Sequence, residues 1–169
     1  VDVVRLSDAE LQQARDKIQE LDCYDVVIFV SLNAARFGAE LIADYWPQLP
    51  VKQRYITFGK GSAALLARIL AAEVEFPADG SDSEAVLRLP ALNEIAGRKV
   101  LILRGVGGRE YLAQTLSRRG AFTDYGELYR RQVQQHDGPR VATELRGLGL
   151  SAVTVHSGES LAALGELVE

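Results

Sequence analysis

The sequence predicts an α/β protein built on a doubly wound parallel sheet, and two observations carry this prediction. Short apolar runs typical of buried strands alternate with segments of amphipathic helical spacing. Three of these runs end in a tight turn of small or basic residues that leads into a helix. Strands that alternate with helices form right-handed βαβ units, in which the strands are parallel and helices cover the sheet.

The predicted strands are runs of apolar and β-branched residues within residues 26–130. They are Val26–Val30, Tyr55–Phe58, Glu73–Phe76, Val100–Leu103 and Phe122–Arg130. Val26–Val30 is apolar throughout, as expected of a strand that is buried on both faces of a parallel sheet. Phe122–Arg130 alternates instead, which is typical of an edge or exit strand.

Helical signals precede and separate these strands. A capping box at Ser7 and Glu10 predicts the start of the first helix, and Ser31 or Asn33 can cap the second, which stops before Pro47. The remaining predicted helices are Ser62–Ala71, a segment opened by Asp82 that runs through Leu92, and Glu110–Arg118, which Gly120 closes.

The chain after the last of these strands repeats the strand–helix order without completing a domain. A polar linker at Gln132–Pro139 leads to a helix at Arg140–Leu148, a strand at Ala152–His156 and a helix from Ser160. A single strand has no sheet of its own to join. The sequence contains no methionine, and it already begins in a strand-like run, Val1–Val4. We therefore expect a fragment with one complete domain and part of a second, similar domain.

Composition argues against several classes of protein. Apolar residues make up 47% of the 169 residues, and the net charge of −4 argues against a general nucleic-acid-binding face. No apolar run approaches the roughly 20 residues that a membrane span needs, and no signal peptide is visible. The one cysteine, Cys23, cannot form an internal disulfide and fits a cytoplasmic protein. We expect it to be a packing or surface residue rather than a nucleophile.

The three strand-to-helix turns fall where open α/β sheets bind ligands, at the carboxyl ends of the strands. They are Ser31–Ala34, Gly59–Ser62 and Arg104–Arg109. Helix N-termini at such turns present free backbone N–H groups and a partial positive charge. The sequence therefore predicts a crevice for a small molecule that carries anionic groups.

Two of the turns come close to nucleotide-binding motifs without matching them. Gly59–Ser62 lacks the earlier glycine of a P-loop, because that position is Tyr55, and it is either a plain turn or a carboxylate site that uses the Ser62 hydroxyl. The turn that begins at Gly105 lacks the last glycine of a dinucleotide fingerprint, where Glu110 stands. Its flanking residues, Arg104 and Arg109, either bind a carboxylate or are solvated.

The remaining polar residues leave their roles open. His136 and His156 have no metal-ligand spacing, so no metal site is expected. Ser157 follows His156 directly, so the two side chains point to opposite faces of a strand, and Ser157 belongs to another turn at a strand end. Tyr129, where the last strand meets the linker, is either a packing residue or a weak general acid.

Four segments form a pattern that is specific through its order and spacing. Tyr24–Arg36 is an aromatic-Asp strand that ends in a Ser-x-Asn-Ala turn. The others are Asp82–Leu87, Val100–Gly105 with Gly108–Glu110, and Leu128–Arg131. Together they resemble the uroporphyrinogen-III synthase family along nearly the whole chain. The resemblance implies two flavodoxin-like domains joined by two linker strands. Residues 7–131 would be the complete inserted domain, and residues 1–6 and 132–169 the linker strands and part of the split domain.

The resemblance also implies an enzyme of haem biosynthesis. The family closes the linear tetrapyrrole hydroxymethylbilane into uroporphyrinogen III, with loss of water and inversion of ring D, and it needs no metal or organic cofactor. Ring closure without inversion is possible unaided, so such an enzyme mainly controls the conformation of its substrate. Backbone N–H groups at helix N-termini suit the substrate's carboxylates.

Site residues follow from positions in the family's motifs. Tyr129 matches a tyrosine thought to assist departure of the hydroxyl group, and Ser62 stands where the family often has threonine. The other residues expected to contact the substrate are Ser31, Asn33, Lys60, Gly61, Arg104, Gly105 and Ser157.

Two alternatives without catalysis remain open. One is a flavodoxin-like module that holds a flavin or another anionic ligand, although the sequence lacks an aromatic flavin-stacking loop. The other is a tetrapyrrole-binding protein that has the fold without the activity. The family resemblance implies a monomer. We expect a cytoplasmic protein whose partner is a small molecule rather than a nucleic acid or a membrane.

Overall fold

The computed structural model describes residues 2–132 and 138–149, together with residues 152, 154, 155, 158, 161, 162, 164 and 165. The chain divides into two compact units, one of Arg5–Arg130 and one of Val1–Val4 with Arg131–Glu169. The second unit contains α6 (Gly138–Gly147), close to the helix expected there. Ser157 and most of the strand expected at Ala152–His156 lie outside the described residues.

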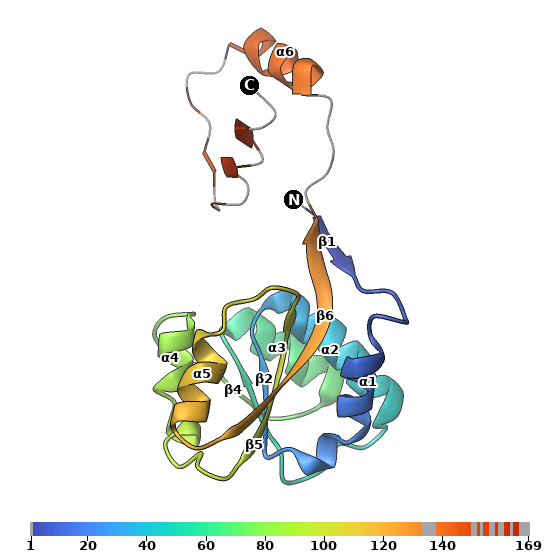
Figure 1. The fold of residues 1–169 in the computed structure, drawn as a ribbon, viewed down its shortest axis with the longest axis vertical. Coiled ribbons are helices and arrows are strands. Elements are labelled where there is room, and N and C mark those ends of the chain that lie inside the picture. The colour runs from blue at the N-terminus through green and yellow to red at the C-terminus, as the bar shows by residue number, and fades with distance from the viewer. Residues whose placement is uncertain are drawn as a thin grey trace. The chain divides into compact units, whose positions relative to one another are not determined.

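A parallel sheet organises the unit Arg5–Arg130 (Figure 1). Its strands are β2 (Val26–Phe29), β3 (Arg54–Thr57), β4 (Val74–Glu75), β5 (Lys99–Gly105) and β6 (Phe122–Gln132). They pair in parallel in the order β6-β5-β2-β3-β4. The short strand β1 (Asp2–Arg5) lies next to β6 at the edge of the same sheet. The winding therefore starts at β2 in the middle, runs outward to β4, and resumes on the other side of β2 with β5. This reversal makes the sheet doubly wound, as the sequence predicts.

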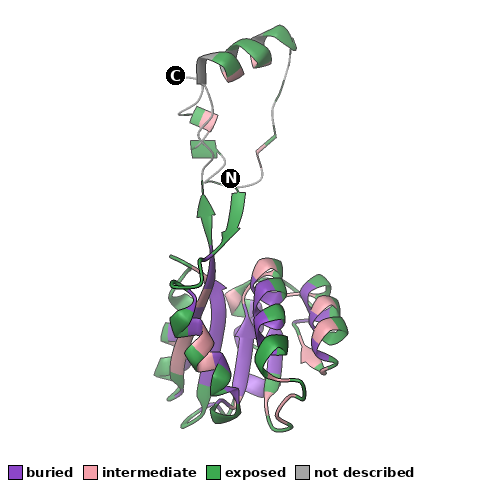
Figure 2. Cartoon of the chain, turned by 90° about the vertical axis from the view of Figure 1, so that its right-hand side faces the viewer, coloured by how far each residue is buried: buried purple, intermediate pink, exposed green. Residues whose placement is uncertain are grey.

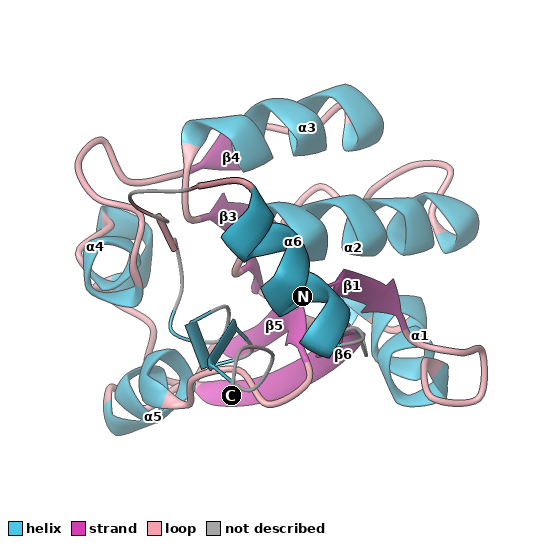
Figure 3. Cartoon of the chain, turned by 90° about the horizontal axis from the view of Figure 1, so that it is seen from above, coloured by secondary structure: helices cyan, strands magenta, loops and turns pink. Residues whose placement is uncertain are grey.

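Helices cover both faces of this sheet (Figure 3). On one face lie α1 (Gln12–Gln19), α2 (Leu32–Tyr45) and α3 (Lys60–Leu70), and on the other lie α4 (Ser83–Leu87) and α5 (Tyr111–Arg118). Alternate side chains of β2 point to opposite faces of the sheet: Phe29 packs with the first group of helices and Ile28 with the second. All of β2 is buried, and the central strands β2, β3 and β5 form the buried layer in Figure 2.

Two helices differ from the prediction for local reasons. The Glu10 carboxylate accepts hydrogen bonds from both the backbone N–H and the hydroxyl of Ser7, at 2.9 and 2.7 Å. The bond from the Ser7 N–H is half of the predicted capping box, but residues 8–11 form a turn and regular α1 begins only at Gln12. The helix opened by Asp82 ends at Leu87 rather than Leu92, because Pro90 disfavours helical backbone at Leu89, which is extended (φ −61°, ψ 136°). Residues Pro90–Leu92 form a separate 3₁₀ turn.

Candidate active site

The carboxyl ends of β2 and β6 meet at Ser31 and Tyr129. Ser31 is the N-cap residue of α2, and its hydroxyl oxygen accepts a hydrogen bond from the Ala34 N–H at 3.0 Å. The same hydroxyl lies 2.9 Å from the phenol oxygen of Tyr129. A serine hydroxyl has one donor and two acceptor lone pairs, so the cap leaves Ser31 able either to donate to the phenol or to accept from it.

Packing fixes the Tyr129 ring behind this hydrogen bond. The side chain is buried, and its ring centroid lies 6.0 Å from that of Phe37. Gly105 leaves room for the ring, because a Cβ atom at Gly105 would lie 2.6 Å from the ring carbon Cε2 of Tyr129. The Val106 N–H donates to the Tyr129 carbonyl at 2.8 Å. The ring is thus held by α2 and by the end of β5, with its hydroxyl at the start of α2.

Arg104 lies beneath the loop that follows β5, and its guanidinium is bound within the domain. It pairs with Glu110 at 2.8 Å and with Glu127 at 3.2 Å, and it donates to the Gly108 carbonyl at 3.2 Å. It also lies 3.8 Å from the ring centroid of Tyr125. Burial acts to lower the pKa of Arg104, but the hydrogen bonds to the two glutamates outweigh it and raise that pKa. The sequence allows Arg104 to be either solvated or bound to a ligand carboxylate; in the structure it is buried and binds carboxylates of its own domain.

Glu110 connects Arg104 to Tyr125. The Tyr125 hydroxyl donates to the Glu110 carboxylate at 2.6 Å. This hydrogen bond, followed by that from Arg104, lowers the pKa of Glu110. Burial, with the hydrogen bond to Glu110, raises the pKa of Tyr125 to about 12. The cluster holds both ends of the loop 105–110, because Arg104 directly precedes the loop and Glu110 is its last residue. Tyr125 anchors Glu110 to the neighbouring strand β6.

The start of α3 offers backbone N–H groups without a side-chain cap. Its N-cap residue is Gly59, with extended backbone, and no side chain there accepts a hydrogen bond. Lys60, Gly61 and Ser62 form the first turn; Lys60 and Gly61 are exposed and Ser62 is buried. Neither α2 nor α3 has an acidic residue in its first turn. The partial positive charge of both helix starts is therefore not offset locally.

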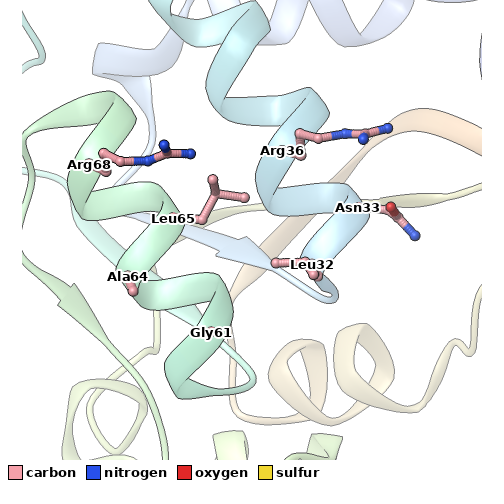
Figure 4. A pocket seen from close by; sticks show the side chains of 7 residues that line it. All are labelled: Leu32, Asn33, Arg36, Gly61, Ala64, Leu65 and Arg68. Carbon is pink, nitrogen blue, oxygen red and sulfur yellow. The ribbon is translucent and has the colours of Figure 1, made fainter.

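A pocket of about 470 Å³ lies between α2 and α3 (Figure 4). Its lining residues are Leu32, Asn33, Arg36, Gly61, Ala64, Leu65 and Arg68. Asn33, an alternative cap in the sequence prediction, lines this pocket, and Ser31 caps the helix instead.

The structure brings together some of the predicted site residues and leaves others apart. Ser31, Gly105 and Tyr129 form one contact group, and Asn33 and Gly61 share the pocket. Sequence reasoning missed Phe37, Arg36 and Arg68. Helical spacing could have found the two arginines, because Arg36 follows Asn33 by one turn and Arg68 follows Gly61 by two turns on the same helix face.

The described part of the chain has neither a cluster of metal-ligating side chains nor a membrane-spanning helix. No group of three or more His, Cys, Asp and Glu side chains there could hold a metal ion. No helix in the described ranges is both long enough and apolar enough to cross a membrane. Cys23 is exposed, in the 3₁₀ turn Leu21–Cys23 that precedes β2.

A family model described as uroporphyrinogen-III synthase HemD matches residues 3–169. The chain belongs to the uroporphyrinogen-III synthase family. It is 36% identical over 158 residues to uroporphyrinogen-III synthase of Salmonella typhimurium and 34% identical over 162 residues to that of Escherichia coli, with 94% of this chain covered in each case. The chain spans 64% and 65% of the length of these two family members.

A solved family member shares the fold. The crystal structure of a mutant uroporphyrinogen III synthase from the extremely thermophilic bacterium Thermus thermophilus matches with a TM-score of 0.62 and 15% sequence identity. The match covers 98% of this chain and 64% of that one. It confirms the predicted α/β fold class.

Proposed function

We propose that this chain carries the cyclising site of a uroporphyrinogen-III synthase, which converts hydroxymethylbilane to uroporphyrinogen III. The observation that carries the proposal is the Ser31–Tyr129 hydrogen bond at the carboxyl edge of the sheet, beside two helix starts that lack acidic residues. Such an edge suits a substrate with several carboxylates and a leaving hydroxyl group. Family membership supports the same reaction.

Tyr129 is the proposed proton donor. The C–O bond of the hydroxymethyl group breaks with both electrons passing to oxygen, the phenol supplies a proton, and water leaves. The resulting azafulvenium cation is attacked by the substituted carbon of ring D, and the spiro intermediate reopens. The unsubstituted α-carbon of ring D then closes the macrocycle in the inverted sense, and the proton that this carbon loses returns to the phenolate. The Ser31 hydroxyl, 2.9 Å from the phenol oxygen, can donate a hydrogen bond to the phenolate while the proton is absent.

The remaining site residues have binding or positioning roles in this proposal. Asn33, Lys60, Gly61, Ser62 and the backbone at Gly105 contact substrate carboxylates from the turns that follow β2, β3 and β5. Arg104 contributes by holding the loop 105–110, since both of its carboxylate partners lie within the domain. Ser157 is proposed as a further contact on the family's pattern.

The same proposal includes the organisation of the whole protein. Residues 7–131 form the inserted domain, while residues 1–6 and 132–169 supply linker strands and part of the split domain. The compact unit Arg5–Arg130 supports these limits. The protein acts as a cytoplasmic monomer without a metal or organic cofactor.

A coupled assay tests the reaction. Porphobilinogen and hydroxymethylbilane synthase supply the substrate, and the oxidised products are separated into type I and type III isomers. We expect type III product. If only the type I isomer forms, as it does without enzyme, the synthase proposal is wrong; retained binding of uroporphyrin would then favour the non-catalytic binding module.

Tyr129→Phe tests the proton donor. Loss of the phenol should lower turnover by at least about tenfold, because the leaving hydroxyl loses its proton source and general acid catalysis typically contributes about 10²- to 10⁴-fold. Tyr24→Phe is the matched control: Tyr24 is also buried and donates to Asp124 at 3.1 Å, but it precedes β2 and lies at the opposite end of the strand from Ser31. Turnover of Tyr129→Phe equal to that of Tyr24→Phe would remove Tyr129 from the mechanism.

A further inference from the structure

We propose that the pocket between α2 and α3 binds one carboxylate-bearing pyrrole ring of the substrate, with Arg68 as the residue that binds the carboxylate. This inference rests on the proposed function and extends it to a subsite that the sequence motifs do not contain. Four properties of the pocket support it: its charge, the direction of Arg68, its apolar lining, and its place next to Ser31 at the start of α2.

The charge of the pocket is positive and not neutralised. Its charged lining residues are Arg36 and Arg68, and no acid lines it. Within the described part of the chain, neither guanidinium has a carboxylate within salt-bridge distance. Arg104 differs from both, because its buried guanidinium is neutralised by two glutamates. In a chain with a net charge of −4, an unneutralised positive pocket is suited to an anionic ligand.

The two arginines differ in direction. Figure 4 shows the Arg68 side chain extending from α3 toward α2, across the pocket. The Arg36 guanidinium points away from α3, and it lies 4.4 Å from the centroid of the Phe37 ring. Arg68 therefore supplies the charge inside the pocket, and the Arg36 side chain forms its wall.

The apolar lining suits the ring to which a carboxylate side chain is attached. Leu32, Ala64 and Leu65 line the pocket together with Arg68. Leu32 is 56% exposed, so its side chain offers apolar surface that a bound ring can cover. A volume of about 470 Å³ exceeds what a free carboxylate ion requires. A pyrrole ring that packs on the leucines and directs its acetate or propionate group to Arg68 matches both the charge and the lining.

The pocket and the proposed reaction site both adjoin the start of α2. Leu32 and Asn33 directly follow Ser31 in the first turn of α2, and Gly61 lies in the first turn of α3. A substrate whose leaving hydroxyl reaches Tyr129 can therefore place a neighbouring ring against the same turn. Binding of that ring would fix the substrate conformation that inversion of ring D requires.

The test compares Arg68→Gln with Arg68→Lys and with Arg88→Gln. Arg88 is an exposed arginine at the end of α4, on the other face of the sheet, and serves as the matched control for net charge. Fluorescence quenching measures the Kd for uroporphyrin III, and the coupled assay measures KM and kcat. We expect Arg68→Gln to raise Kd and KM by about tenfold, as the loss of a charge-assisted hydrogen bond does, with kcat nearly unchanged. Arg68→Lys should lie between it and the wild type.

The readouts separate this subsite from other roles of Arg68. Arg68 also lies in the last turn of α3, where a positive charge stabilises the helix, but that role would change the melting temperature and leave Kd unchanged. Equal Kd values for Arg68→Gln and Arg88→Gln would overturn the subsite. An active wild type with an unchanged KM in Arg68→Gln would also overturn it and leave the proposed function standing. A wild type without type III product, whose uroporphyrin binding still depends on Arg68, would reject the function and retain the subsite.

Discussion

Ser31 and Gly59 occupy the same position at the starts of two neighbouring helices, and their backbones are nearly the same: φ −163° and ψ 169° at Ser31, φ −170° and ψ 168° at Gly59. In both helices the N-cap carbonyl accepts the first intrahelical hydrogen bond, from Ala35 in α2 and from Ala63 in α3. The difference is the side chain. Ser31 accepts from the N–H three residues later and contacts Tyr129, whereas Gly59 has no side chain to do either.

The comparison shows how one backbone geometry serves two purposes. At α2 an internal side chain satisfies one N–H group and places a phenol at the helix start. At α3 the corresponding N–H of Ser62 finds no side-chain acceptor at the cap residue, which is Gly59, and the first turn carries Lys60 instead of an acid. The first arrangement favours a fixed reacting group, and the second favours binding of an external anion.

The largest expected effect comes from Gly105→Ala. This change disturbs the Tyr129 ring at the start of α2 and leaves the start of α3 unchanged. The new Cβ would lie 2.6 Å from the Tyr129 ring, so the ring must move away from Ser31. We expect a loss of about 1–3 kcal/mol in unfolding free energy, typical of overpacking, and a fall in turnover comparable to that of Tyr129→Phe. Gly147→Ala is the control, since Gly147 ends α6, is not a proposed site residue, and a Cβ atom there would meet no described atom within 4 Å. Denaturant unfolding and the coupled assay measure both effects, and equal turnover in the two variants would contradict the steric argument.

Ser31→Gly makes the two helix starts alike. Glycine is nearly as good a cap as serine, with a difference of only a few tenths of a kcal/mol. The main loss is therefore the hydrogen bond to Tyr129, about 1 kcal/mol of unfolding free energy. Turnover should fall several-fold. In a double-mutant cycle with Tyr129→Phe the two losses should be less than additive; strict additivity would show that the two hydroxyl groups act independently.

Glu110→Gln tests whether the loop beside Tyr129 depends on charge. The pKa of Glu110 is lowered in the folded state, so its ionised form stabilises the fold above the ordinary pKa of 4.5, and this contribution is lost as pH falls through the lowered value. The side chain is 50% exposed, so we expect less than about 1 kcal/mol. The stability difference between wild type and variant should be present at neutral pH and shrink below pH 4.5. A difference that is constant with pH would contradict this origin.

Gly59→Ser is the smallest and most selective change, because it gives α3 the cap that α2 has. A Cβ at Gly59 meets no atom within 4 Å, so a serine fits. Stability should rise by a few tenths of a kcal/mol. The new hydroxyl should compete with a ligand carboxylate for the Ser62 N–H and weaken uroporphyrin binding by a few-fold. Unchanged or tighter binding would show that the open start of α3 is not used for anions.

Most of the fold could be predicted from local patterns. The strands and the helices that follow the three turns lie within a few residues of the predicted limits, because apolar runs and N-cap residues determine them. The early end of the helix opened by Asp82 has an equally local cause, at Pro90. A proline inside a helical pattern is visible in the sequence, whereas the sequence does not show that residues 8–11 form a turn before regular α1 begins at Gln12.

The site could be predicted only as a set of candidates. The hydrogen bond between Ser31 and Tyr129 joins residues 98 positions apart, which no local spacing reveals. The partners of Arg104 depend on strand register, since Glu127 stands directly opposite it on β6. The direction of Arg68 depends on how α3 packs beside α2. Each of these is a tertiary property of the assembled sheet.

The central position of β2 also has a consequence for folding kinetics. β2 pairs with β3, the next strand in the chain, but its other neighbour, β5, follows only after α2, β3, α3, β4 and α4. The open start of α3 directly follows β3, whose pairing with β2 closes a shorter loop than the pairing of β5 with β2. The Ser31 hydroxyl, in contrast, contacts Tyr129 only after both β5 and β6 have joined the sheet. A partly folded domain would therefore present an anion-attracting helix start before it has a positioned phenol, so binding competence would precede catalytic competence as the chain folds.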